Sequence, residues 1–329
     1  MFENKKEINI VFLGGSITQG AGSSDKSKCF ANMTGEWFKE KYGADRVNYY
    51  NKGVGGTPSF YGLLRLQRDV IAYNPDMVFV EFAVNDTGSD SRVYLESIVR
   101  MLGNIPSNPY IVFLYTTNKD YTTPTQNFEQ VANYYGIPQI SLKDALKREL
   151  NGEDAFEAGY LADSVHPSDK GYEVYYNEMI RLLEKEEYYK KPIKKEKTLV
   201  EGCFAADTRF ISSTEVLHTD GWKVTTIGER KSLLAEKENE SIEFEFDGNI
   251  LGFEHGLHQD SGVYNVYVDD KLIGTGSPYY SNNESNQLVF GFVTTDLDDG
   301  HHKVKVETAK GEHGGTRILL YNIIIGNKN

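Results

Sequence analysis

Two widely separated motifs of this sequence carry residue types suited to nucleophilic catalysis. The first is Gly-Gly-Ser-Ile-Thr at residues 14–18, directly after the apolar run 8–13. β-Branched residues followed by two glycines indicate a buried strand that ends in a tight turn, which would present Ser16 at the carboxyl edge of a sheet. A serine hydroxyl acts as a nucleophile when a base can reach it. The second motif, Asp-Ser-Val-His-Pro at residues 163–167, supplies His166 as the candidate base.

Two further motifs between these supply candidate hydrogen-bond donors. Asn-Lys-Gly-Val-Gly-Gly-Thr at residues 51–57 and Ala-Val-Asn-Asp at residues 83–86 each follow a short apolar strand pattern. When an ester carbonyl is attacked, negative charge builds on its oxygen, and preorganised donors stabilise that charge. The backbone N–H at Gly56 and the side-chain amide of Asn85 are suitable donors. Taken singly, each motif is also typical of a loop or a helix cap, so the prediction depends on the ordered set of four.

In their order and local context, these four motifs resemble those of the SGNH hydrolases, also called GDSL-type esterases. The resemblance implies a flavodoxin-like three-layer α/β/α fold and ester hydrolysis by a catalytic triad. It also implies that Ser16 is the nucleophile, that His166 is the general base and that Asp163 orients the imidazole. The N–H groups of Ser16 and Gly56, with the side chain of Asn85, would form the oxyanion hole.

Within residues 8–186, over which the resemblance holds, the chain departs from the family pattern at two positions. Gly15 stands where the family usually has aspartate, and Ala83 stands where it usually has glycine. Neither change removes a group with a chemical role in ester hydrolysis, so we expect an active enzyme. The departures leave open the alternative of an inactive relative that only binds carbohydrate. Gly15 and Asp86 are predicted to contribute to substrate binding.

The sequence predicts two domains joined by a charged segment. Residues 1–190 alternate apolar strand patterns with helical ones, including one helix over residues 61–73, as an α/β domain with a parallel sheet requires. Residues 191–200 combine lysines with a proline and are predicted to be a linker. Residues 201–329 show short alternating strand patterns between turn residues, which predict an all-β sandwich. This second half resembles the jelly-roll-like modules that accompany SGNH domains in some carbohydrate esterases.

Aromatic residues of the second half are candidates for sugar binding. Tyr279 and Tyr280 are predicted to contact substrate, with Trp222 and Tyr264 as further members of a stacking platform. An aromatic ring offers a flat apolar face with a polar rim, which suits a sugar ring. The alternative is that these rings belong to the core of the sandwich.

Two histidines of the second half, His255 and His258, are expected in an exposed glycine-rich loop. A metal site there would need imidazoles that converge with a carboxylate, and one loop does not guarantee that geometry. No metal and no cofactor are therefore predicted.

Composition narrows the class of partner. The net charge of −13 over 329 residues argues against nucleic acid, which requires a basic surface. No apolar run reaches the length of a membrane span, and the charged start lacks the apolar core of a secretory signal. The protein is therefore expected in the cytoplasm, or outside the cell if a leader was removed. Two cysteines do not define a redox compartment, and the oligomeric state stays open.

The expected function is hydrolysis of short acyl esters, most simply O-acetyl groups, on a carbohydrate. A lipase or acyl-thioesterase for longer chains is the alternative enzyme, but the loops 20–28, 87–91 and 119–125 beside the motifs are small and polar. A further alternative makes the second domain a docking or oligomerisation module, with specificity left to the first.

Overall fold

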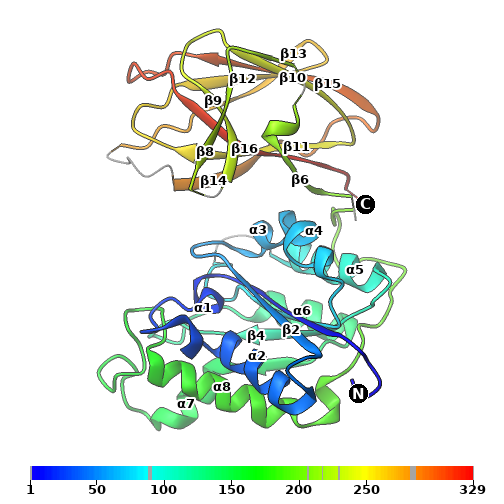
Figure 1. Cartoon of the computed structure of the whole chain (residues 1–329), viewed down its shortest axis with the longest axis vertical. Coiled ribbons are helices and arrows are strands. Elements are labelled where there is room, and N and C mark those ends of the chain that lie inside the picture. Colours follow the sequence, from blue (N-terminus) through cyan, green and yellow to red (C-terminus); the bar gives the residue numbers. More distant parts are fainter. Residues whose placement is uncertain are drawn as a thin grey trace. The chain divides into compact units, whose positions relative to one another are not determined.

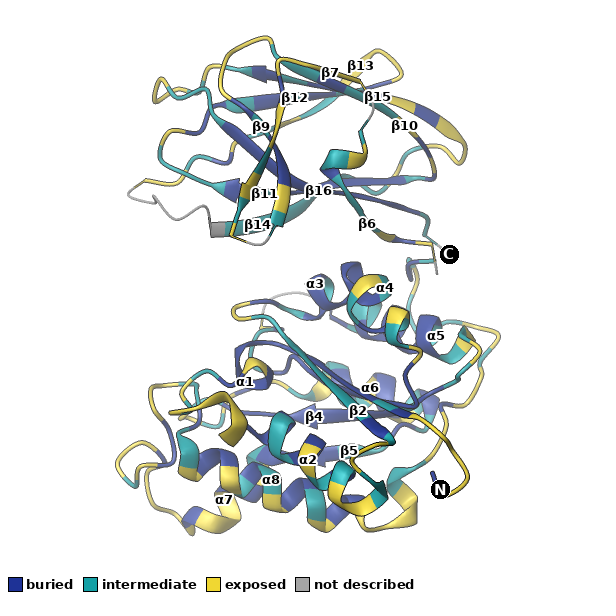
Figure 2. Cartoon of the chain, viewed as in Figure 1, coloured by how far each residue is buried: buried dark blue, intermediate teal, exposed yellow. Residues whose placement is uncertain are grey.

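A computed structural model of the chain describes residues 2–87, 91–205, 207–216, 218–228, 230–281 and 287–328. Residues 88–90, within one of the loops expected to favour a short acyl group, lie outside the described residues. The chain divides into two compact units, residues 1–203 and 204–329. Each unit has its own hydrophobic core, coloured dark blue in Figure 2.

The first unit is built on a parallel sheet with the strand order β2-β1-β3-β4-β5. Residues of β1, β3 and β4 are almost wholly buried, as in strands that helices cover on both faces. The strand order reverses between β1 and β3, and sheets of this kind bind ligands at the carboxyl ends beside such a point. The predicted parallel α/β architecture is therefore confirmed. The strands are β1 (Ile8–Gly14), β2 (Val47–Gly53), β3 (Met77–Glu81), β4 (Tyr110–Tyr115) and β5 (Gln139–Ser141).

Helices cover both faces of this sheet (Figure 1). On one face, α2 (Phe30–Tyr42), α7 (Leu142–Leu150) and α8 (Asp169–Leu183) pack against one another. On the other face lie α3 (Ser59–Leu64), α5 (Arg92–Asn104) and α6 (Gln126–Tyr135). The short helices α1 (Ser16–Gln19) and α4 (Leu66–Asp69) follow strand β1 and helix α3.

The single helix predicted over residues 61–73 is wrong. The chain forms α3, then α4, then a 3₁₀ turn at Ile71–Tyr73. The break falls at Arg65, where the backbone leaves helical geometry with φ −94° and ψ 5°. The Arg65 side chain is fully buried and donates to the main-chain carbonyls of Gly14 and Lys52 at 3.0 and 2.7 Å. The guanidinium thus joins the ends of β1 and β2, at the edge of the sheet where the predicted nucleophile lies.

The segment 191–200, predicted as a linker, lies along the first unit. The N–H of Ile193 donates to the carbonyl of Tyr135 at 2.8 Å. Further along, the N–H of Leu199 donates to the carboxylate of Glu96 at 2.6 Å. These bonds fix the segment to helices α5 and α6.

The second unit is all β, as predicted. Its two antiparallel sheets have the orders β13-β12-β15-β10-β7 and β14-β11-β16-β9-β8, and β6 pairs with β16 outside the second path. Strands β6–β9 were not predicted, because they are short and interrupted by polar residues. The strands are β6 (Arg209–Ser212), β7 (His218–Asp220), β8 (Lys223–Ile227), β9 (Arg230–Ala235), β10 (Ser241–Asp247), β11 (Ile250–Leu257), β12 (Val263–Val268), β13 (Lys271–Gly276), β14 (Gln287–Thr294), β15 (His301–Ala309) and β16 (Ile318–Gly326).

Two predictions for side chains of the sandwich are wrong. Trp222 and Tyr264 are each 5% exposed and pack in the core, so they cannot offer a ring face to a sugar. His255 belongs to strand β11, and Tyr264 Oη lies 3.1 Å from its Nδ1. Burial lowers the pKa of His255 to about 4.

Candidate active site

The predicted nucleophile sits in a tight turn between β1 and α1. Strand β1 ends at Gly14, and Ser16 is the first residue of α1. A Cβ atom on Gly14 would overlap the side chain of Thr18, so only glycine allows the helix to start so close to the strand. Ser16 is 8% exposed, and its hydroxyl is held in a defined position rather than mobile in solvent.

The structure brings the three predicted triad residues together. His166 Nε2 lies 2.8 Å from Ser16 Oγ, and His166 Nδ1 lies 2.7 Å from Asp163 Oδ2. The other carboxylate oxygen, Asp163 Oδ1, accepts the N–H groups of Val165 and His166, each at 2.8 Å. Burial works to raise the pKa of Asp163, but these hydrogen bonds outweigh it and hold that pKa below its ordinary value. Asp163 is therefore ionised and able to orient the imidazole.

The loop that carries Asp163 and His166 is fixed from two sides. The N–H of Ala162 donates to the carbonyl of His166 at 2.8 Å, which closes the loop on itself. The N–H of Lys119, from the segment after β4, donates to the carbonyl of Ser164 at 2.9 Å. The base is thus held in place by main-chain contacts.

The groups predicted to bind an oxyanion lie beside the predicted nucleophile. A Cβ atom on Gly55 would lie 3.8 Å from the Cβ of Ser16, which places the turn of Gly55 and Gly56 directly against it. Gly56 adopts φ +71°, a conformation that favours glycine. Asn85 Oδ1 is buried and accepts no hydrogen bond from any residue that the structure describes. Its Nδ2 is not buried, and it donates to no described residue.

Asn85 and Asp86 differ in their surroundings. A Cβ atom on Gly15 would lie 2.5 Å from Asn85 Oδ1, so the amide packs directly on the glycine before the nucleophile. Asp86 is buried, and its Oδ1 accepts the N–H of Ser59 at 2.9 Å, at the start of α3. Burial raises the pKa of Asp86 to about 6. Contact of Gly15 or Asp86 with substrate stays a prediction.

Two buried charged residues behind the nucleophile turn were missed by the sequence reasoning. One is Arg65, which donates to the carbonyl of Gly14. The other is Glu81, the last residue of β3, which is 1% exposed. Glu81 stands alone in an apolar run, and a lone charge in an otherwise apolar pattern was the available sign of it. Arg65 lies close to Arg68 and Asp69 in the sequence and gave no such sign.

The two aromatic residues predicted to bind substrate, Tyr279 and Tyr280, belong to the second unit. The ring of Tyr279 stacks on that of His313, with centroids 3.9 Å apart and an interplanar angle of 19°. Tyr280 is 54% exposed. A role for either in sugar binding stays a prediction.

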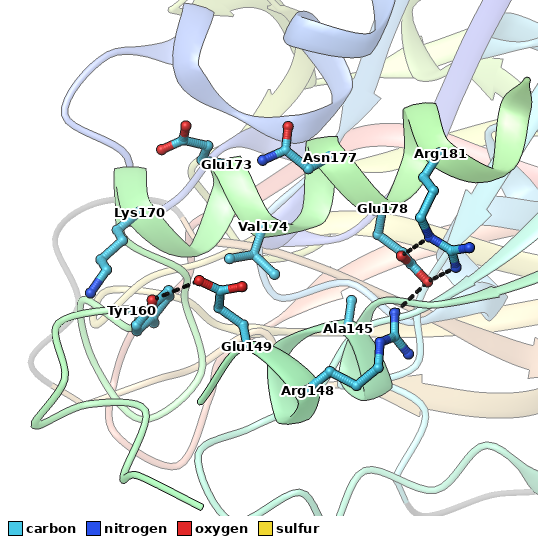
Figure 3. A pocket seen from close by; sticks show the side chains of 10 residues that line it. All are labelled: Ala145, Arg148, Glu149, Tyr160, Lys170, Glu173, Val174, Asn177, Glu178 and Arg181. Atoms are coloured by element: carbon cyan, nitrogen blue, oxygen red, sulfur yellow. Dashed lines mark hydrogen bonds and ion pairs between the residues drawn. The ribbon is translucent and has the colours of Figure 1, made fainter. Parts of the chain in front are cut away.

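A groove of about 450 Å³ lies elsewhere on the first unit, between α7 and α8 (Figure 3). One of the residues that line it is Glu178, whose carboxylate is paired with Arg148 and Arg181 at 2.7 and 2.8 Å. None of the predicted site residues lines this groove. In the described part of the chain, no group of three or more His, Cys, Asp or Glu side chains is arranged to hold a metal ion.

Comparison with known proteins finds a family match within the first unit. The GDSL-like lipase/acylhydrolase family matches residues 12–174, which include all four motifs. The fold and this match define the class of protein, a carboxylic ester hydrolase of the SGNH/GDSL type. The matched residues lie within the first unit and make up just under half of the chain. No protein of curated function matches it.

Both units recur together in solved structures. Two crystal structures of a two-domain esterase (CEX) active on acetylated mannans, one of them co-crystallised with mannopentaose, match with TM-scores of 0.82 and 0.83. Each match covers 98% of this chain and 92% of the other, at 21% sequence identity. The likeness shows a shared two-unit fold. None of the helices described here is long and apolar enough to cross a membrane.

Proposed function

We propose that this protein hydrolyses short O-acyl esters, most simply O-acetyl groups, on a carbohydrate. The observation that carries the proposal is the continuous chain of contacts from Asp163 through His166 to the Ser16 hydroxyl, at 2.7 and 2.8 Å. Nucleophile, base and orienting carboxylate in this geometry are the requirements of acyl transfer to a serine.

The chemistry follows from these contacts. His166 Nε2 takes the proton of Ser16 Oγ as the oxygen attacks the ester carbonyl, and the C=O electron pair moves to the oxygen. The N–H groups of Ser16 and Gly56 and the Nδ2 of Asn85 stabilise this oxyanion, each by about 3 kcal/mol. The alcohol leaves with the proton from His166. Water then repeats the sequence on the acyl-enzyme, which releases the acid and restores Ser16.

Two observations support a short acyl group on a sugar. Loop residues 20–28 and 119–125 beside the motifs are mostly polar or small, which disfavours a long alkyl chain. The two-unit fold is shared with an esterase active on acetylated mannans, although identity is only 21%. The second support is an analogy of fold, so the sugar itself must be found by experiment.

Substrate screening tests the proposal. Rates on p-nitrophenyl acetate, butyrate and octanoate should fall with chain length, and acetate should be released from acetylated oligosaccharides. A preference for octanoate would overturn the acetyl assignment in favour of a lipase or thioesterase. Labelling by a fluorophosphonate, which reacts rapidly only with an activated serine, should occur in the wild type and be lost in Ser16→Ala. A wild type that is not labelled would indicate a binding protein without catalysis.

A further inference from the structure

A buried carboxyl group lies behind the nucleophile turn and contacts residues just beyond the ends of β1 and β4, the two strands that flank β3. Glu81 Oε2 accepts the hydroxyl of Thr18 at 2.8 Å, and Oε1 accepts the hydroxyl of Thr116 at 2.6 Å. The main-chain carbonyl of Glu81 also accepts the N–H of Gly15 at 3.1 Å. All three groups of this residue that can accept a hydrogen bond are therefore used.

The partners of Glu81 connect it with both halves of the proposed catalytic pair. Thr18 lies two residues after Ser16 in the single helical turn α1. Thr116 directly follows strand β4, and three residues later the N–H of Lys119 holds the carbonyl of Ser164 at 2.9 Å. Ser164 lies in the loop of Asp163 and His166. The Glu81 side chain thus links the turn that carries the nucleophile to the strand end that supports the base.

We propose that Glu81 is a positioning residue that acts through the Thr18 hydroxyl and sets Ser16 Oγ within reach of His166 Nε2. The inference rests on the function proposed above. Glu81 makes no described contact with Ser16 Oγ or His166, so it acts through the turn and not on the reacting atoms.

Packing alone does not explain a carboxyl group at this place. Its neighbours in β3 are apolar and fully buried, and an uncharged apolar residue would avoid the desolvation that burial imposes. Burial raises the pKa of Glu81. The side chain of Thr18 sits directly over Gly14, where a Cβ atom would overlap it, so the hydroxyl has a fixed direction. The link therefore holds α1 against β3 in one geometry, as preorganised sites require.

Two substitutions of Thr18 distinguish the contribution of its hydroxyl to catalysis from that of its shape. Thr18→Val keeps the volume and removes the hydrogen bond, whereas Thr18→Ser keeps the hydroxyl. Thr34→Val is the matched control, because Thr34 is also fully buried and its hydroxyl bonds to no described residue. In p-nitrophenyl acetate hydrolysis, Thr18→Val should lower kcat about tenfold to hundredfold with KM within about twofold, since small displacements of a nucleophile are costly. Thr18→Ser and Thr34→Val should stay within about threefold of wild type.

Glu81 itself is tested by a second pair of variants. Glu81→Gln keeps an oxygen that can accept from Thr18 and should retain most of kcat, whereas Glu81→Leu should lose as much as Thr18→Val. If the two residues act as one unit, adding Thr18→Val to Glu81→Leu should cause no further loss of kcat.

Two results would overturn the inference. One is wild-type kcat in Thr18→Val, and the other is a Thr18→Ser variant as slow as Thr18→Val, which would make shape rather than the hydroxyl decisive. Both results can be obtained only if the wild type is an active esterase. A wild type without esterase activity or fluorophosphonate labelling contradicts the proposed function instead, so the two failures are distinguishable.

Discussion

Asn85 Oδ1 lies 2.5 Å from the position that a Cβ atom on Gly15 would occupy. Gly15 has φ −89°, outside the positive range that favours glycine. The missing side chain instead leaves room for the amide of Asn85. In this chain, any larger side chain at position 15 would have to displace that amide.

Gly15→Ala should therefore damage catalysis more than stability. The methyl group must push aside the end of a flexible side chain, which we expect to cost less than about 1 kcal/mol of unfolding free energy. A shifted oxyanion donor should lower kcat about tenfold or more. Measurement of kcat beside thermal unfolding checks both parts. Gly103→Ala in α5, where the nearest atom is 3.9 Å from the added Cβ, should retain full kcat. Full activity in Gly15→Ala would contradict the argument.

Asn85→Ala should lower kcat by about 10²–10³, the usual loss for one oxyanion-hole donor, with little change in KM. Its melting temperature should not fall, because Oδ1 is buried without a described donor and its removal relieves an unsatisfied group. Asn85→Asp keeps the shape but brings a negative charge beside the oxyanion, so it should be slower than Asn85→Ala. Equal kcat in wild type and Asn85→Ala would exclude this residue from the oxyanion hole.

The proposed triad should behave as one unit. Ser16→Ala and His166→Ala should each lower kcat by about 10⁴-fold or more, and the double variant should be no slower than either. Asp163→Asn should cost less, since the asparagine oxygen can still accept the N–H groups of Val165 and His166. Steady-state kinetics on p-nitrophenyl acetate measures all four variants. Additive losses in the double variant would show that the two residues act independently.

The parts of the site that the sequence predicted share one property. Ser16, Gly56 and Asn85 stand in motifs that follow β1, β2 and β3, and the parallel order of strands brings such ends to one edge of the sheet. His166 stands in a motif directly before helix α8. Continuous apolar runs likewise predicted the strands of the first unit, and short alternating patterns predicted most strands of the second. A short sequence motif was therefore enough to predict a site residue where that residue directly follows a strand.

The sequence could not reveal which face of an element is covered. Alternation in β12 places Tyr264 on one face of its strand, but only the second sheet decides that this face is the core. Arg65 was taken as part of an ordinary helix, because nothing nearby in the sequence shows that its guanidinium reaches Gly14. Glu81 is marked in the sequence as a lone charge, but its partners Thr18 and Thr116 come from other elements and could not be identified from the sequence.

Burial of His255 predicts a loss of stability in acid. Its pKa is lowered from 6.5 to about 4 in the folded chain, because burial disfavours the charged imidazole. Between these pH values the unfolded chain binds a proton that the folded chain does not, so the free energy of unfolding falls as pH falls through this window. The full shift corresponds to about 3 kcal/mol, and acidification from pH 7.5 to 5 should remove about 2 kcal/mol.

His255→Gln removes this titration and keeps a group that can bond to the hydroxyl of Tyr264. In a Trp37→Phe background the remaining tryptophan is Trp222, buried in the core of the second unit, so its fluorescence follows unfolding of that unit. In urea unfolding, the free energy of unfolding should fall less between pH 7.5 and pH 5 in His255→Gln than in the Trp37→Phe protein that keeps His255. His218→Gln, at an exposed residue of β7, should keep the wild-type dependence. An unchanged acid loss in His255→Gln would assign the sensitivity to other groups.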